Sequence, residues 1–364
     1  MRIEKEIDNM YIHTFEVSAI LTNELFYNIQ NDIKTNDKDK WKAKKNGMEY
    51  WGLSDKGIFI NMHTTKKKGY YGYSLTYRIS ARRVMENDNY VGLFDTNNYY
   101  SLEEKVNKLL KNKSSNFPKL KNCKLKRIDF CINAVLDNQE QVKAYIKTSK
   151  RAKLPGSLSE YKIYDKTAKR TKPTKDDFTA YSSEYIAVSI YNKYAEMKKQ
   201  KKSVFPKSEI DRAKNIVRIE IRCMEDKVKA LKKKYDIDTI QDFMEYGDII
   251  GTSLYQYYLP KMFGEGEICT LKRALDRIEM SGLKQENKEL MREFIEQANS
   301  DRSASAAYSA FKSAFGKKET KRILYMFDLI ATNYVTVTNS DAKLFDCGYI
   351  PTPIELFEEF KNQI

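Results

Sequence analysis

The sequence predicts an α+β fold, with an antiparallel sheet that carries helices on one face and leaves a polar face open, followed by a mostly helical C-terminal domain. Strand-like alternation of apolar and polar residues dominates up to residue 223, and helical periodicity dominates from residue 225 onward. The charge changes at nearly the same point. Residues 236–364 carry 15 basic and 21 acidic side chains, a net charge of −6, whereas residues 1–235 carry a net charge of +21. We therefore predict two domains, 1–235 and 236–364.

The basic first segment contains the predicted strands. In chain order they are expected at residues 9–20, 49–53, 57–65, 70–80, 124–136, 161–165, 184–191 and 216–223. Helices are expected at 22–33, 102–110 and 138–150, the first two with the hydroxyls of Thr22 and Ser101 as N-caps. The strands at 161–165 and 184–191 are expected to pair with each other across a long basic loop.

The second segment reads as helical. Helices are expected at 227–234, 239–256, 270–280, 285–298, 303–315, 319–332 and 353–361, the last with Pro353 in its first turn. Residues 333–337 alternate like a strand, so the stretch from 303 to 337 fits a winged helix. The same stretch also fits a plain helical bundle, and the sequence leaves both open.

Three strands have polar residues on a side that a doubly covered sheet would make apolar. The polar positions are Arg127, Asp129, Cys131 and Asn133 in the first strand, Arg218, Glu220 and Arg222 in the second, and Phe59, Asn61 and His63 in the third. This pattern predicts one open sheet face. The alternative is a solvated face that holds cross-strand ion pairs.

The open face offers a set of chemically useful side chains. Asp129, Glu220 and His63 would form a mixed oxygen and nitrogen ligand set that suits Mg²⁺ or Mn²⁺. Tyr191 lies where a strand passes into a basic helix, and we interpret it as a nucleophile toward a DNA phosphate. Because the pKa of a tyrosine is near 10, Lys193 and the metal are expected to lower it.

Three motifs in this order carry a family resemblance: Arg127-Ile128-Asp129, then Ile190-Tyr191-Asn192-Lys193 with Glu196, then Arg218-Ile219-Glu220-Ile221-Arg222. Together they resemble the rolling-circle replication initiators of Gram-positive plasmids and phages, and the related relaxases of integrative elements (the Rep_trans type). The resemblance covers residues 10 to 225, roughly.

The resemblance implies a nicking-closing enzyme of the HUH class, named for its histidine–hydrophobe–histidine motif. Such an enzyme binds an origin hairpin, cleaves one strand and keeps a 5′-phosphotyrosine bond while the 3′-hydroxyl primes synthesis. It implies Tyr191 as the nucleophile, and Asp129 and Glu220 as acidic metal-site residues. The sequence departs from the common pattern because Asn61-Met62-His63 stands where that motif is expected.

Two other tyrosines compete with Tyr191. Tyr164 lies in a similar Ile-Tyr-Asp-Lys run, and Tyr194 follows Tyr191 by three residues. Tyr191 is preferred because Glu196 and the strand 218–222 follow it at the spacing expected of the family.

The charge of the first segment favours a polyanion, and we expect DNA in the form of an origin hairpin, single-stranded or distorted. The expected DNA-binding residues are Arg127, Arg218, Arg222, Lys66, Lys67, Lys68, Lys169, Arg170, Lys198 and Lys199. Lys66 to Lys68 lie beside several tyrosines, a mix that suits phosphate pairing and base stacking. An anionic membrane is a second candidate, but no apolar run is long enough to span one.

The five cysteines form no Cys-x-x-Cys pair, and a structural zinc site is not expected. Reduced thiols and no recognisable signal peptide predict a cytoplasmic protein. The acidic C-terminal segment is expected to form a homodimer, to hold a host helicase or to bind DNA. The competing function is a non-catalytic origin-binding initiator or repressor, which the same charge distribution also fits.

Overall fold

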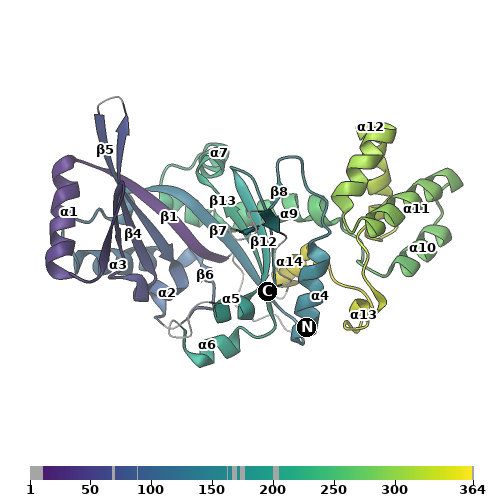
Figure 1. The fold of residues 1–364 in the computed structure, drawn as a ribbon, viewed down its shortest axis with the longest axis horizontal. Helices are drawn as coiled ribbons and strands as arrows, with labels where there is room; N and C mark the ends of the chain where they lie inside the picture. The colour runs from purple at the N-terminus through teal and green to yellow at the C-terminus, as the bar shows by residue number, and fades with distance from the viewer. Residues whose placement is uncertain are drawn as a thin grey trace.

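The computed structural model describes residues 11–67, 70–87, 89–161, 163–165, 170–172, 177–199 and 205–362. It contains one large antiparallel sheet that extends through the first two-thirds of the chain (Figure 1). The strand order is β2 (Trp41–Lys44), β3 (Gly47–Tyr50), β4 (Ile58–Lys67), β5 (Tyr70–Ser80), β1 (Tyr11–Leu21), β7 (Lys124–Val135), β13 (Ile216–Cys223), β12 (Ile186–Asn192), β11 (Phe178–Ser182) and β8 (Ser159–Glu160), and β6 (Phe94–Asp95) pairs with β1 outside this path. The predicted α+β class with an antiparallel sheet is confirmed.

Local signals account for several element ends. The Thr22 hydroxyl accepts a hydrogen bond from the backbone of Leu25 at 3.2 Å and caps α1 (Asn23–Asn36), as predicted. Asn138 caps α4 (Gln139–Ser149) in the same way. Ser101 is not a cap, because α3 (Tyr99–Lys111) begins two residues before it. The short helix α2 (Ala81–Met85), which the sequence did not predict, follows β5 directly.

The pairing predicted for β12 is wrong. β12 pairs with β11, whereas β9 (Ile163–Asp165) pairs with β10 (Arg170–Lys172) in a sheet of its own. The Ser183 hydroxyl accepts from the backbone of Tyr185 and Ile186, both at 3.2 Å, and so fixes the turn between β11 and β12. Closing this short hairpin costs less chain entropy than closing the long loop that we expected.

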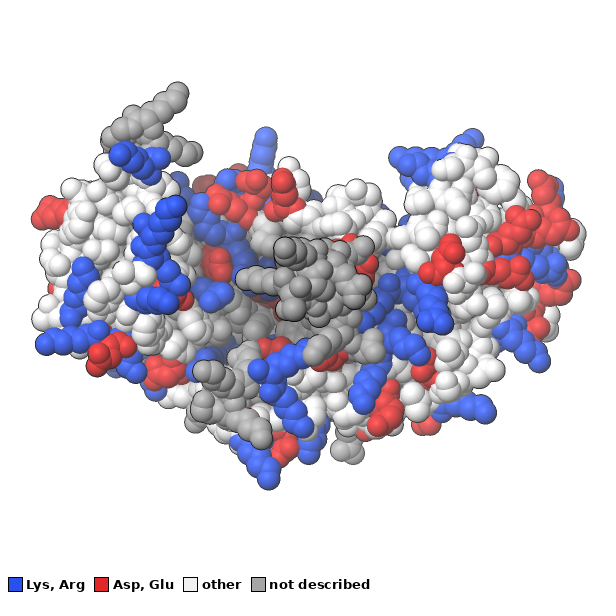
Figure 2. Space-filling view, viewed as in Figure 1, with Lys and Arg blue, Asp and Glu red and all other residues white. Residues whose placement is uncertain are grey.

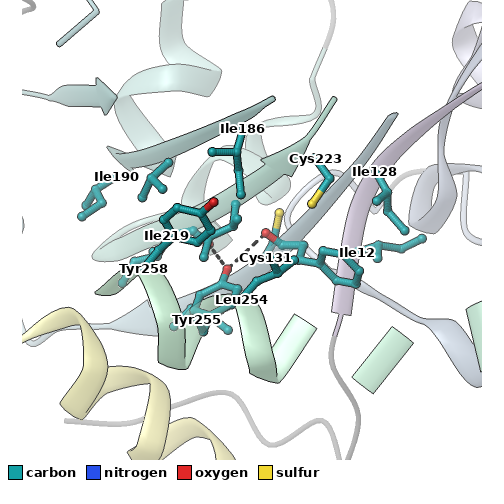
Figure 3. Packing of buried hydrophobic residues seen from close by; sticks show 14 of the residues in the cluster. Ile12, Ile128, Cys131, Ile186, Ile190, Ile219, Cys223, Leu254, Tyr255 and Tyr258 are labelled. Atoms are coloured by element: carbon teal, nitrogen blue, oxygen red, sulfur yellow. Dashed lines mark hydrogen bonds between the residues drawn. The ribbon is translucent and has the colours of Figure 1, made fainter. Parts of the chain in front are cut away.

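C-terminal helices complete the apolar side of the sheet. Ile128, Phe130, Ile219 and Ile221 are fully buried there. Tyr255 on α9 (Gly247–Phe263) places its hydroxyl 3.1 Å from the carbonyl oxygen of Phe130 and 2.7 Å from that of Ile219 (Figure 3). These contacts join β7 and β13 from behind.

Other helices cover the same side. α14 (Pro353–Asn362) packs on α9 and β7, and α7 (Glu225–Tyr235) packs on β7. The domain boundary at residue 235 therefore stays a prediction, and the segments on either side of it share one hydrophobic core.

The end of the molecule opposite to α1 is a helical lobe (Figure 1). It contains α10 (Leu271–Met280), α11 (Gln285–Ser300) and α12 (Ala304–Leu329). The two helices predicted at 303–315 and 319–332 form α12, which is broken at Gly316 with φ 80°. The helix predicted at 239–256 is instead divided into α8 (Ile240–Glu245) and α9. Residues 333–337 form no strand beyond a single bridge from Val337 to Thr270, so these described residues build a bundle and no wing.

The Tyr255 hydroxyl gives a test of how firmly α9 holds the sheet. We expect Tyr255→Phe to lower the free energy of unfolding by about 1–3 kcal/mol, because two buried carbonyl oxygens lose their donor. Denaturant unfolding measures the loss. Tyr325→Phe is the matched control, since Tyr325 is 61% exposed, and it should change stability little. Equal stability of the two variants would contradict the role given to Tyr255.

Candidate functional site

The polar residues of the central strands meet in one cleft of about 490 Å³. Strand register brings them together: Asp129 is opposite Arg222, Cys131 is opposite Glu220, and Arg218 is opposite Tyr191. The predicted or motif residues that line the cleft are Arg127, Asp129, Tyr191, Lys193, Glu196, Lys199, Glu220 and Arg222. They share one cavity although they come from three separate segments of the chain.

Tyr191 is nearly buried, and its hydroxyl donates a hydrogen bond to Glu220 Oε2 at 3.1 Å. Burial, and then the negative charge of Glu220, raise the pKa of this phenol well above its ordinary value. The expectation that Lys193 lowers this pKa is therefore wrong for the structure as it stands. Lys193 Nζ instead pairs with Glu196 Oε2 at 2.9 Å. Burial and the nearby Arg218 lower the pKa of Lys193.

Two guanidinium groups hold the cleft carboxylates. Arg127 Nε and Arg222 Nε lie 2.8 Å and 3.0 Å from the same oxygen, Asp129 Oδ1. Arg222 Nη2 also donates to Glu220 Oε1 at 2.8 Å. Burial and the nearby charge of Asp129 raise the pKa of Glu220. The polar face is thus a connected network that runs from Arg127 to Tyr191.

Arg218 has a different position from the one we expected. It is fully buried, so its place is inside the protein and not on a DNA-facing surface. Its guanidinium donates to Asn133 Oδ1 at 2.8 Å and to the backbone oxygen of Val91, which also accepts from Asn133 Nδ2 at 3.2 Å. Arg218 therefore ties the segment at Val91 to the sheet beside Tyr191.

The structure does not bring His63 to the cleft. His63 is exposed on β4 and pairs with Ser74, which pairs with Ile20, whereas Asp129 pairs with Thr14. His63 is therefore three strands away from Asp129 and six residues farther along, roughly 14 Å across the sheet and 20 Å along it.

His13 lines the cleft instead. It lies at an irregularity in β1, where the register with β7 shifts between Ile12 and Thr14. Burial, and then repulsion by Arg218 and Lys193, lower the pKa of its imidazole. No sequence pattern predicts such a bulge, which explains why the residue was missed.

Other residues of the cleft were also missed. Phe59, Arg78, Arg83 and Tyr90 line it together with the network. Phe59 was recognised on the polar side of its strand but was given no role. Arg83 belongs to the unpredicted helix α2, so nothing in the sequence linked it to this face.

The carboxylate pair is the part of the cleft that suits a metal ion. Across the described ranges, no three His, Cys, Asp or Glu side chains converge as a ready-made metal site. Mg²⁺ is often held by only one or two carboxylates together with substrate phosphates. Asp129 and Glu220 meet that smaller requirement, provided that Arg222 releases them.

The predicted basic residues outside the network are dispersed. Lys66 lies 5.3 Å above the ring of Tyr71, Lys198 lies 4.2 Å above that of Tyr194, and Lys199 pairs with Asp177 at 2.7 Å at the cleft. Lys68 and Lys169 lie outside the described residues, and the backbones of Lys67 and Arg170 belong to β4 and β10. Figure 2 shows Lys and Arg over much of the visible face of the sheet region, whereas Asp and Glu gather at the end formed by α10 and α11.

The competing tyrosines lie elsewhere. Tyr194 faces a second cavity, lined also by Gln139, Lys143 and Lys198, and not the cleft of Asp129. Tyr164 belongs to β9, outside the main sheet. Tyr191 is the candidate that shares the carboxylate cleft.

A comparison with protein families finds one match, to the family model Phage_CRI, which describes the N-terminal part of a replication-associated protein, over residues 7–245. The matched range contains the whole cleft. Neither the curated proteins nor the solved structures include a significant match. Among the described residues, no helix is both long and apolar enough to cross a membrane.

The buried position of Arg218 predicts a structural effect. We expect Arg218→Met to lower the free energy of unfolding by about 2–4 kcal/mol, because Asn133 and Val91 keep buried acceptors whose donor is gone. Thermal or denaturant unfolding measures this loss. Lys233→Met on the exposed side of α7 is the control. An Arg218 variant that is as stable as wild type but binds DNA weakly would restore the expected DNA contact.

Proposed function

The chain belongs to the Phage_CRI family of replication-associated proteins, a family of rolling-circle replication initiators, and we propose that it starts replication by nicking one DNA strand at an origin. The observation that carries this proposal is the hydrogen bond between Tyr191 and Glu220 in a cleft with cationic walls. A hydroxyl that faces a carboxylate base is the arrangement that nucleophilic attack needs.

In the proposed reaction, the Tyr191 oxygen attacks the phosphorus of the scissile phosphate. A bond forms between that oxygen and phosphorus, and the bond from phosphorus to the 3′-oxygen breaks. Glu220 accepts the phenol proton; its raised pKa places it nearer to neutral pH, as a general base requires. Lys193, whose pKa is lowered, is the proposed donor of a proton to the leaving 3′-oxygen. The products are a 5′-phosphotyrosine and a free 3′-hydroxyl, and reversal of the step rejoins the strand.

Asp129 and Glu220 are the proposed ligands of Mg²⁺ or Mn²⁺. Bound there, a divalent cation would neutralise charge that develops on the phosphate. His63 is too distant to take part, and His13 is the imidazole that lines the cleft with these carboxylates. Arg127 and Arg222, released from Asp129, would pair with DNA phosphates.

The other proposed partners follow from charge. The proposed ligand is an origin hairpin with a single-stranded or distorted region, contacted by the basic residues around the cleft. A host helicase and a second copy of the chain stay predictions for the acidic helical lobe. The proposed setting is the cytoplasm, which agrees with five free cysteines.

Tyr191→Phe tests the nucleophile. The variant should lose the covalent DNA adduct completely, because it lacks the attacking oxygen, and should keep its DNA affinity within about threefold, as expected for a change of one atom off the phosphate contacts. The measurement is a denaturing gel of protein and labelled single-stranded origin oligonucleotides with Mn²⁺. Tyr194→Phe is the matched control and should form the adduct.

The outcomes separate the alternatives. An adduct that persists in Tyr191→Phe and disappears in Tyr194→Phe or Tyr164→Phe would keep the reaction and move the nucleophile. Tight origin binding by wild type with no adduct under any condition would favour the non-catalytic initiator.

The metal proposal is tested by binding alone. We expect Asp129→Asn to weaken Mn²⁺ binding at least about tenfold, since the pair loses one charged oxygen donor. Electron paramagnetic resonance of free Mn²⁺ measures this without any reaction. His63→Ala should bind Mn²⁺ as wild type does. Equal affinity of Asp129→Asn and wild type would remove Asp129 from the site.

A further inference from the structure

Two pairs of arginine and aromatic side chains line the cleft at a distance from Tyr191. The guanidinium of Arg78 on β5 lies 5.1 Å from the ring centre of Phe59 on β4. The guanidinium of Arg83 on α2 lies 4.5 Å from the ring centre of Tyr90. All four side chains belong to the wall of the same cavity. The proposed reaction uses none of them.

Strand register shows how this wall joins the carboxylate network. Phe59 is opposite Arg78, Arg78 is opposite Glu16, and Glu16 is opposite Arg127, so one row of the polar face crosses four strands. Arg127 then pairs with Asp129. A strand of DNA that leaves Tyr191 along this face would pass Asp129 and Arg127 before it reaches Phe59.

The two arginines of the wall differ from those of the network. Arg127 and Arg222 are held by carboxylates, whereas no ion pair to Arg78 or Arg83 occurs among the residues that the structure describes. Arg83 Nε is buried and has no hydrogen-bond partner in that part of the chain. These cations are therefore available for an anionic ligand.

The rings point to the chemistry of that ligand. Phe59 and Tyr90 are only partly buried, although they lie among polar and charged side chains. Aromatic rings and guanidinium planes on an open sheet stack unpaired bases, while the cations pair with the phosphates between them. A duplex keeps its bases stacked inside and offers a flat ring no such face.

We infer that the Phe59–Arg78 and Arg83–Tyr90 pairs form a stacking wall for unpaired bases of the strand that leads to Tyr191. The inference rests on the proposed function and adds the form of its ligand, which is single-stranded DNA held through its bases as well as its phosphates. Arg78 and Arg83 supply charge and a planar surface, and Phe59 and Tyr90 supply the rings.

The experiment compares two probes in a Tyr191→Phe background, so that no strand is cut. One probe is fluorescent oligothymidylate, and the other is an abasic strand of the same length, which has phosphates but no bases. Phe59→Leu removes the ring and keeps an apolar side chain, whereas Phe59→Trp keeps a ring. Tyr325→Leu, on the exposed side of α12, is the matched control.

We expect Phe59→Leu to weaken oligothymidylate binding by roughly fivefold to 100-fold, the range for one lost base stack, and to leave abasic binding unchanged. Phe59→Trp and Tyr325→Leu should bind both probes as the parent does. Arg78→Ala should weaken both probes, since it removes a cation as well as a stacking plane.

Equal losses on both probes, or no loss on either, would overturn the stacking wall, and thermal melting of each variant separates either result from unfolding. The reaction is judged independently by the adduct of the wild-type chain. A base preference that depends on Phe59 in a protein that never forms an adduct would retain the wall and remove the nicking proposal. An adduct with no dependence of binding on Phe59 would do the reverse.

Discussion

The buried carboxylate of Asp129 is the constraint on which the polar face depends. An ionised carboxylate that is 1% exposed needs charged partners, and Arg127 and Arg222 supply them from its own strand and from the neighbouring one. Arg222 then holds Glu220, and Glu220 accepts from Tyr191. Each contact fixes the next, so the position of the tyrosine follows from the way in which one buried charge is satisfied.

The other face of the same strands explains why that network can be precise. Antiparallel strands expose alternate residues, and here Ile219 and Ile221 face a core closed by α9 while Glu220 between them faces the cleft. Tyr255 bonds the carbonyl oxygens of β7 and β13 from the apolar side. A polar cluster needs a rigid support to keep its geometry, and helices distant in sequence provide it.

Period-two alternation predicted the strands from 124 and from 216, and with them the shared face of Asp129 and Glu220. That information is local. It contains neither the register that places His63 far from the cleft nor the bulge that brings His13 into it. Arg218 has the same alternation as Glu220, yet it is buried because the segment at Val91 folds over it. Contacts of this kind depend on chain segments that only the tertiary fold brings together, and no pattern within one strand encodes them.

The network also bears on the order of events in the proposed reaction. While Arg222 bridges Asp129 and Glu220, the two carboxylates have a cation between them and Tyr191 keeps its proton. If Arg222 turned to a phosphate, two buried like charges would face each other, which is costly unless another cation replaces the guanidinium. A DNA phosphate and a divalent cation together offset that cost, because one attracts the arginine and the other takes its place. On this reasoning the site is inactive until strand and metal are both present, and Arg222 is the residue that couples them.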